Sequence, residues 1–317
     1  MRIQKSKVVI IGAGNVGTTT AYTLVNKGLC DEIALIDLDQ EKAYGEVLDL
    51  AQSIEYMSRN TTIKLGDYSD CHDAAICIIT ASAPMKKDEN DRIKMLAPSK
   101  KVMKSIIDNI MANGFDGHIV IATNPVDIMT YYAYKLSGLP GNQVIGTGTT
   151  LDTARLKYFI AKKIDVDPRS VNALVIGEHG DSEMIPWSTV TIGGKDIYSV
   201  VRDNKERIGE APYQQMKQQT IQAGWEIFNR KGNTCYGIAS SAVGIVEAIL
   251  HNENRILPVS TLLQGQYGQD DLYISVPTVI DRSGAREIVE LNMTDEEMAE
   301  FNHSCKHIRS FYQALED

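Results

Sequence analysis

The first 146 residues alternate short apolar segments with longer amphipathic ones, and this alternation restricts the possible folds more than any other feature of the chain. The short segments are apolar on both faces, as in a parallel sheet that helices cover on both sides. The longer segments place apolar residues three and four positions apart, which is the spacing of helices. Strands are predicted at 7–11, 32–36, 75–80, 118–123 and 143–145, and helices at 16–26, 41–57, 93–111 and 126–136. The sequence therefore predicts an α/β fold with a doubly wound parallel sheet.

The pattern changes after residue 146. A helix predicted at 151–163 is followed by antiparallel-looking strands across 171–192, two long helical patterns and a final group of strands. At roughly 100 to 200 residues per domain, the chain should form about two domains. We expect a first domain at 1–146 and a second, mixed α+β domain at 147–317, packed closely because no Pro/Gly/Ser-rich linker separates them.

Charge and cysteine usage exclude several classes of function. The formal net charge is −9, and no basic run suits nucleic acid or an anionic membrane surface. The five cysteines are scattered without Cys-x-x-Cys spacing, so neither a disulfide framework nor a zinc ribbon is indicated, and no metal site is predicted. No apolar run reaches the ~20 residues of a spanning helix, and the run after Lys7 ends at Gly12, too early for a signal peptide. A cytoplasmic location is expected.

Residues 12–17, Gly-Ala-Gly-Asn-Val-Gly, follow the first predicted strand and open the first predicted helix. In this context a Gly-x-Gly-x-x-Gly pattern indicates a dinucleotide site of the Rossmann type. Gly12 would make the tight turn, Gly14 would let a pyrophosphate approach the backbone, and Gly17 would allow the helix to pack closely on the strand. The helix N-terminus would supply amide donors and a favourable dipole to the phosphates.

Asp37 closes the second predicted strand, twenty positions after Gly17. A carboxylate there can accept hydrogen bonds from both ribose hydroxyls and would repel a 2'-phosphate, so NAD is predicted rather than NADP. A second explanation, in which Asp37 only caps the helix that begins near Glu41, stays open.

His179 lies between glycines in Gly177-Glu178-His179-Gly180-Asp181, directly after an apolar segment. The backbone can bend there, and the imidazole can reach a cleft. Reduction of a ketone requires a proton as well as a hydride, and histidine titrates near neutrality. We therefore interpret His179 as a candidate acid/base, although a lone histidine is more often structural.

Asp152 and Arg155 stand three positions apart early in a predicted helix and so project from one face of it. An exposed ion pair is one explanation. The alternative uses both residues: Asp152 would orient His179 and favour its imidazolium form, while Arg155 would bind a substrate carboxylate with its two-pronged guanidinium.

A polar stretch at 85–92 separates an apolar strand from the long helix that follows. Such stretches are usually solvated loops. A mobile lid is equally polar, and Arg92 at its end would polarise the reacting carbonyl while the closed lid excludes water.

Taken together, these motifs make the chain resemble the L-lactate dehydrogenase branch of the lactate/malate dehydrogenase superfamily over nearly its whole length. The matching motifs, in the family's order and approximate spacing, are 12–17, Ala-Thr-Asn-Pro-Val-Asp at 122–127, Leu-Asp-Thr-Ala-Arg at 151–155, Gly-Glu-His-Gly-Asp at 177–181 and Lys-Gly-Asn-Thr at 231–234. Such an ordered set is far more specific than any single motif.

The resemblance implies reversible, NAD-linked hydride transfer between pyruvate and L-lactate. It implies His179 as acid/base, Asp152 as its partner, Arg155 as the carboxylate clamp and Arg92 as the lid arginine, with Asn124 and Thr234 lining the substrate pocket. The residues expected to bind NAD are Gly12, Gly14, Asn15, Val16, Gly17, Asp37, Ser82, Ala83, Ser105, Asn124 and Thr147. A small 2-keto acid is the expected partner, and a homotetramer is the expected assembly. Retention of the four catalytic side chains argues against a non-catalytic dinucleotide-binding homologue.

The sequence departs from the family at Met85, where lactate dehydrogenases usually have glutamine and malate dehydrogenases have arginine. Met85 offers no charge for a second carboxylate, so oxaloacetate is a poor candidate unless Lys86 takes that place. Because methionine is flexible and apolar, and because Gly224 replaces a common alanine and leaves room near Thr234, larger branched 2-keto acids are an alternative to pyruvate. The chain would then resemble L-2-hydroxyisocaproate dehydrogenases.

Lys157 and Asn172 stand where lactate dehydrogenases activated by fructose 1,6-bisphosphate typically have arginine and histidine. A neutral asparagine cannot supply the same charge to a phosphate. Activation by that sugar phosphate is therefore expected to be weak or absent.

Overall fold

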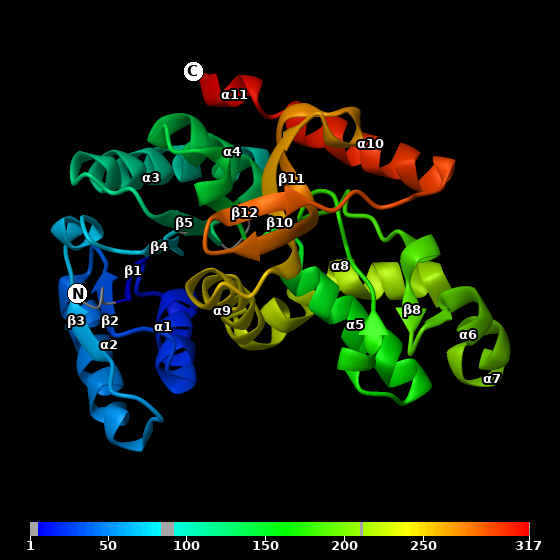
Figure 1. The fold of residues 1–317 in the computed structure, drawn as a ribbon, viewed down its shortest axis with the longest axis horizontal. Coiled ribbons are helices and arrows are strands. Elements are labelled where there is room, and N and C mark those ends of the chain that lie inside the picture. Colours follow the sequence, from blue (N-terminus) through cyan, green and yellow to red (C-terminus); the bar gives the residue numbers. More distant parts are fainter. Residues whose placement is uncertain (1–5, 84–91, 210–211, 317) are drawn as a thin grey trace.

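A computed structural model describes residues 6–83, 92–209 and 212–316 of the chain, apart from the side chains of 92–95 and 316 (Figure 1). Its largest sheet has the strand order β12-β11-β10-β6-β5-β4-β1-β2-β3. The helices within these ranges are α1 Asn15–Lys27, α2 Gln40–Ser53, α3 Arg92–Ala112, α4 Val126–Ser137, α5 Thr150–Ile164, α6 Ile197–Asp203, α7 Lys205–Ile208, α8 Pro212–Lys231, α9 Tyr236–His251, α10 Asp295–Arg309 and α11 Gln313–Glu316. Short 3-10 helices connect several of these elements. No helix in the described ranges is long and apolar enough to span a bilayer.

The first half of the chain forms the parallel part of the sheet, which confirms the predicted doubly wound fold. Its strands are β1 Lys7–Ile11, β2 Glu32–Ile36, β3 Thr62–Leu65, β4 Ile76–Ile79, β5 His118–Ile121 and β6 Val144–Gly146, each paired in parallel with its neighbours among them. Strand β3 was not predicted from the sequence. It is an edge strand whose side chains are only partly buried, so it lacks the continuous apolar run that marked the other strands.

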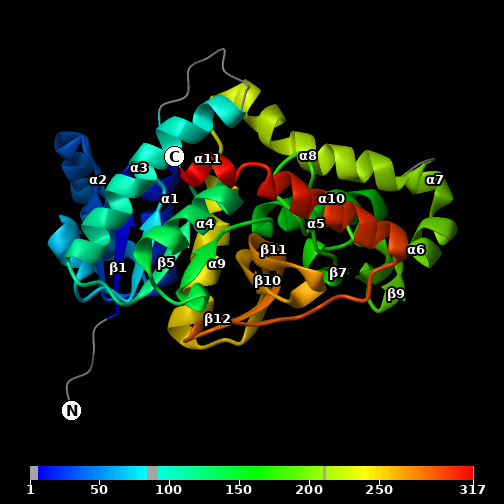
Figure 2. The same cartoon turned by 90° about the horizontal axis from the view of Figure 1, so that it is seen from above.

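Helices cover both faces of this sheet, α1, α2 and α9 on one face and α3 and α4 on the other (Figures 1 and 2). Successive side chains of β1 point to opposite faces. Val8 and Ile10 therefore enter the core beneath α1, while Val9 and Ile11 enter the core beneath α3. Burial on both faces is the reason that these strands are apolar at every position.

The final strands extend the same sheet. The antiparallel strands are β10 Arg255–Gln264, β11 Asp270–Asp281 and β12 Gly284–Ile288. Strand β10 joins β6 through the pair Ser260 and Gly146. A third core lies under α5, α6 and α8, away from this sheet. The second half is thus mixed α+β, as predicted.

The strands expected across 171–192 are much shorter than the pattern suggested. A three-stranded sheet contains β7 Val171–Asn172, β8 Thr191–Ile192 and β9 Lys195–Asp196. Between β7 and β8, the buried apolar segment makes single bridges, Ile176 with Met184 and Gly177 with Ser275. Its apolar character reflects packing in the core, and the loop that the first bridge closes carries His179.

Candidate active site

The glycine motif forms the turn between β1 and α1. Gly12 has a φ of 112°, and a Cβ there would lie 2.6 Å from the backbone nitrogen of Ala81. A Cβ on Gly17 would lie 1.8 Å from the carbonyl oxygen of Gly12, so only glycine permits this contact. A Cβ on Gly14 would meet no described atom within 4 Å, and no described side chain caps α1. The motif therefore leaves an open approach to the free amides at the start of α1, which suits a pyrophosphate.

Asp37 lies beside this turn, at the carboxyl end of β2. Its Oδ2 accepts a hydrogen bond of 2.6 Å from the backbone N–H of Ala13, and its Oδ1 accepts one of 2.9 Å from that of Asp39. Asp39, not Asp37, accepts the capping hydrogen bond of α2 from Lys42. The simple capping explanation thus applies to Asp39, while Asp37 is held against the glycine turn.

Most of the other predicted cofactor residues lie at the same edge of the sheet. Ser82 and Ala83 follow β4, Asn124 follows β5, and Thr147 follows β6. Ligands of doubly wound sheets bind outside the carboxyl ends of the strands, so this placement suits a dinucleotide. Asn15 is exposed at the start of α1. Ser105 is different, because it lies exposed on α3 and is not among the residues that line the cavity described next.

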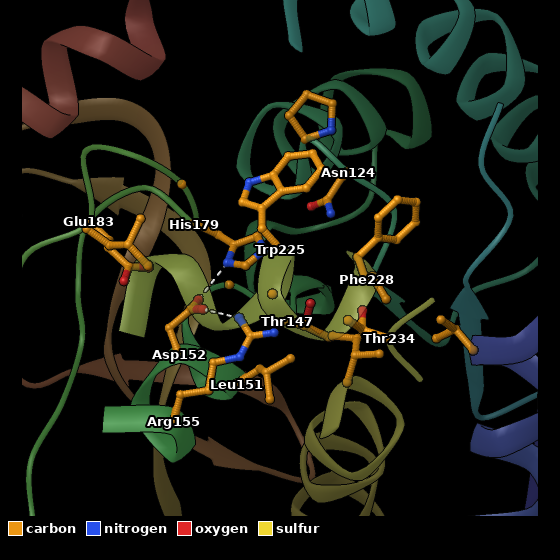
Figure 3. A pocket seen from close by; sticks show the side chains of 18 residues that line it. Asn124, Thr147, Leu151, Asp152, Arg155, His179, Glu183, Trp225, Phe228 and Thr234 are labelled. Carbon is orange, nitrogen blue, oxygen red and sulfur yellow. Dashed lines mark hydrogen bonds and ion pairs between the residues drawn. The ribbon is translucent and has the colours of Figure 1, made fainter. Parts of the chain in front are cut away.

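A cavity of about 310 Å³ opens at this edge (Figure 3). Its polar side chains are Asn124, Thr147, Asp152, Arg155, His179, Glu183 and Thr234, and Val16 reaches it from α1. Its apolar wall includes Leu151, Ile221, Trp225, Phe228 and Ile238. Gly224 also lines it, and a Cβ there would lie 3.4 Å from Nη2 of Arg155. The room left by this glycine therefore adjoins the Arg155 guanidinium.

Three charged side chains meet in the cavity. Asp152 Oδ2 lies 2.5 Å from Nδ1 of His179, and Asp152 Oδ1 accepts a hydrogen bond of 2.8 Å from Nη1 of Arg155 (Figure 3). The side chain of Asp152 is only 2% exposed, whereas that of His179 is 26% exposed. The buried carboxylate therefore holds both cationic groups, and the imidazole and guanidinium border the cavity.

The electrostatics of this cluster favour its charged forms. Burial by itself would lower the pKa of His179, but the charge and hydrogen bond of Asp152, with smaller contributions from the charges of Glu183 and Asp127, outweigh it and raise that pKa to about 9. Burial would likewise raise the pKa of Asp152, but His179 and Arg155 hold it below its ordinary value. At neutral pH the imidazole therefore carries the proton that a carbonyl acceptor needs.

The backbone of His179 is fixed from a different element. Its N–H donates a hydrogen bond of 2.8 Å to Oδ2 of Asp127 on α4. Asp127 is 2% exposed, and burial raises its pKa to about 6. Gly177, with a φ of 94°, turns the chain into the loop, and its N–H donates to the carbonyl oxygen of Ser275 at 2.9 Å. Imidazole and loop are thus positioned independently.

Comparison with known proteins identifies the family. The NAD binding domain model of lactate/malate dehydrogenase matches residues 6–146, and the model of its alpha/beta C-terminal domain matches residues 149–315. The chain belongs to the lactate/malate dehydrogenase family. Membership confirms the predicted resemblance, makes the chain an oxidoreductase and identifies NAD as its cofactor.

Relatives in this family match over the full chain. L-lactate dehydrogenase 3 of Bacillus cereus is 44% identical, with 99% of each chain covered. L-lactate dehydrogenase 1 of Bifidobacterium longum is 45% identical, again with 99% of each covered. The crystal structure of minor L-lactate dehydrogenase from Enterococcus mundtii in the ligands-bound form is 42% identical, with a TM-score of 0.94 over 98% of this chain and 99% of that one.

The structure describes neither side chain of the two family positions in the predicted lid. Met85 belongs to 84–91, which is not described, and Arg92 is described only as the first backbone position of α3. Lys157 is half-buried on α5 and Asn172 is exposed at β7. The roles of Met85 and Arg92 and the weak effect of the sugar phosphate remain predictions.

Several residues of the cavity were not predicted from the sequence. Ile221, Trp225 and Phe228 on α8 follow the i, i+4, i+7 spacing of one helix face, a signal that could have marked a wall. Glu183 gave no such signal. It stands four residues after His179 outside any regular element, so only the folded loop reveals that its carboxyl lines the cavity.

Proposed function

We propose that this chain catalyses the reversible, NAD-linked interconversion of pyruvate and L-lactate, with His179 as proton donor and acceptor. The observation that carries the proposal is the contact of Asp152 with both His179 and Arg155 inside one cavity at the carboxyl edge of the sheet. A proton donor and a carboxylate-binding cation then face the same space.

The residues of the chain divide the work of the reaction. The pyrophosphate would lie over the turn at 12–17, and Asp37 would bind the adenine ribose. Ser82 and Ala83 after β4, Asn124 after β5 and Thr147 after β6 would contact the rest of NAD. Bound NAD supplies or accepts the hydride at C2 of the substrate. Arg155 binds the substrate carboxylate through two N–H groups. His179 donates its proton from Nε2 to the carbonyl oxygen, while its Nδ1 stays bonded to Asp152. Arg92 would polarise that carbonyl, and Asn124 and Thr234 would shape the pocket.

Pyruvate is the proposed substrate because the relatives that match the full chain carry the name L-lactate dehydrogenase. Comparing kcat/KM for pyruvate, 2-ketoisocaproate and oxaloacetate tests this choice. Pyruvate should be preferred, and a strong preference for oxaloacetate would overturn the proposal.

The test of the mechanism is His179→Asn, assayed by NADH oxidation with pyruvate. General acid catalysis contributes about 10²- to 10⁴-fold, so turnover should fall by that order while NADH binding, followed by its fluorescence, remains. His303 on α10 is exposed and serves as the control, since His303→Asn should retain full activity. Equal losses in the two variants would contradict the role of His179.

The proposal includes organisation and assembly. We assign NAD binding to 1–146 and the substrate side chains mainly to 147–317, in a cytoplasmic homotetramer. Tyr44 and Leu48, one helical turn apart on α2, are 49% and 42% exposed, which suits a subunit contact. Light scattering of the protein as it elutes from a size-exclusion column gives its molar mass and so tests the tetramer.

A further inference from the structure

Glu183 is the buried acid of the cavity that the proposed mechanism does not use. Glu183 is 2% exposed, and its Oε1 atom has no hydrogen-bond partner among the described residues. A buried carboxyl oxygen without a partner costs free energy, so its presence in this cavity calls for an explanation.

The loop fixes Glu183 relative to the imidazole. Ile176 and Met184 exchange two backbone hydrogen bonds of 2.9 Å, which close the loop that carries both His179 and Glu183. The backbone N–H of Glu183 also donates to the carbonyl oxygen of Gly180 at 3.3 Å. The separation between the carboxyl and the imidazole is therefore set by a short, closed segment.

Charged groups from three directions face this carboxyl. A carboxyl oxygen of Glu183, one of Asp152 and a ring nitrogen of His179 all lie within 4.8 Å of one another (Figure 3). Arg155 on α5 and Lys217 on α8 add positive charge at longer range. Lys217 also pairs with Glu300 on α10, at 2.6 Å.

Asp127 is a further acidic neighbour of His179. Asp127 on α4 accepts a hydrogen bond from the backbone N–H of His179, and its charge also raises the pKa of the imidazole. Its geometry differs from that of Glu183, because Asp127 bonds to the main chain of His179, while Glu183 stands beside the ring and Asp152.

We propose that Glu183 is a positioning residue that acts through His179, as a second carboxyl group that keeps the imidazole protonated to higher pH than Asp152 does alone. This inference rests on the proposed function, in which protonated His179 binds and reduces the keto acid.

The direction of the effect follows from the charge states. Burial, with the nearby Asp152, raises the pKa of Glu183 well above its ordinary value, so this carboxyl stays neutral to higher pH than an exposed glutamic acid does. A neutral carboxyl exerts little Coulomb effect on the ring. Once ionised, the carboxylate stabilises the imidazolium through a low-dielectric interior. Glu183 can therefore only extend the protonated range of His179 upward.

The variant Glu183→Gln removes the ionisable group and keeps its shape. Its kcat/KM for pyruvate should match that of the wild type near pH 6. In the plot of kcat/KM against pH, the alkaline fall should begin at a pH lower by at least about half a unit than in the wild type. The matched control is Glu226→Gln on α8, where the same change removes an exposed carboxylate paired with Arg230. The control variant should keep the alkaline fall of kcat/KM at the wild-type pH. Profiles of Glu183→Gln and wild type that overlay, or an alkaline fall that moves to higher pH, would overturn the inference.

A second measurement does not depend on activity. Infrared difference spectra between wild type and Glu183→Gln should show a protonated carboxylic C=O band that disappears as pH rises, before or together with the deprotonation of His179. If Glu183→Gln does not fold, isotope-edited spectra of the wild type follow the same band. A carboxyl ionised throughout, or one that loses its proton only after His179, would overturn the inference. An inactive wild type would instead refute the proposed function, so the two failures are distinguishable.

Discussion

Nδ1 of His179 lies 2.5 Å from Oδ2 of Asp152, whose other oxygen accepts a hydrogen bond from Arg155 at 2.8 Å. One buried carboxylate thus holds the proton donor and the carboxylate-binding cation in a fixed relation. The fixed Nδ1–Asp152 bond also leaves Nε2 as the atom that exchanges a proton with substrate. Two consequences for activity follow, one for its pH dependence and one for the loss of Asp152.

The change of kcat/KM with pH should have opposite signs for pyruvate reduction and for L-lactate oxidation. Because the pKa of His179 is raised to about 9, kcat/KM for pyruvate should stay level through neutrality and fall about tenfold per pH unit above about 9. For L-lactate, which needs neutral imidazole, it should rise across the same range. A folded-state pKa above the unfolded value of 6.5 also gives stability that is complete below about 6.5 and lost as pH rises through about 9. Initial rates in both directions check this, and an alkaline limb near 6.5 would contradict it.

Replacing Asp152 with asparagine should lower kcat/KM for pyruvate by about 10²- to 10⁴-fold. The amide cannot stabilise the imidazolium, so the alkaline limb should also move to lower pH. Asp167→Asn is a suitable control, since Asp167 pairs with exposed Arg169 and neither residue lines the cavity. If activity falls but the pH of the alkaline fall in kcat/KM does not change, Asp152 acts only in packing.

The fold was predictable where one physical requirement determined many residues. Strand β1 is apolar at Val8, Val9, Ile10 and Ile11 because both faces are buried, and a sheet covered on one side would have shown alternation. Strand β3 escaped prediction because it is a half-exposed edge. Its position depends on pairing with β2, which the local pattern does not encode.

The site was predictable in part for a similar reason. The i, i+3 spacing of Asp152 and Arg155 placed them on one helix face, and the glycines marked a turn. The contact with His179 joins residues 27 positions apart, so it depends on how α5 packs against the loop. Glu183 could not be found from the sequence, because its chemistry comes from burial beside that contact.

Arg155→Lys should retain the positive charge and lose most of the substrate affinity. Lysine cannot form two parallel N–H bonds to a carboxylate, and a charge-assisted hydrogen bond contributes about 1.5–3 kcal/mol, so the KM for pyruvate should rise about 10- to 100-fold. Steady-state kinetics with pyruvate provide the measurement. Arg169→Lys, whose side chain is 91% exposed, should change neither KM nor kcat. An unchanged KM in Arg155→Lys would exclude a two-pronged clamp.

Gly17 and Gly14 should respond oppositely to alanine. A Cβ on Gly17 would lie 1.8 Å from the Gly12 carbonyl oxygen, so Gly17→Ala should destabilise the fold by about 1–3 kcal/mol. Gly14 has open space around it, so Gly14→Ala should change unfolding by less than about 0.5 kcal/mol and weaken NADH binding instead. Denaturant unfolding and NADH fluorescence titration separate the two effects. Equal stability of both variants would contradict the packing role of Gly17.

Asp37→Ser should weaken the preference for NADH over NADPH. Asp37 is held at the glycine turn by the N–H of Ala13, where its carboxylate would accept from the ribose hydroxyls and repel a 2'-phosphate. Removing that charge should lower the NADH to NADPH ratio of kcat/KM by about tenfold or more, a change of about 1.4 kcal/mol. Asp39→Ser is the matched control, because serine can still cap α2 and the lost carboxylate is exposed. If Asp37→Ser keeps the wild-type ratio, or if Asp39→Ser changes it equally, the discrimination originates elsewhere in the cofactor site.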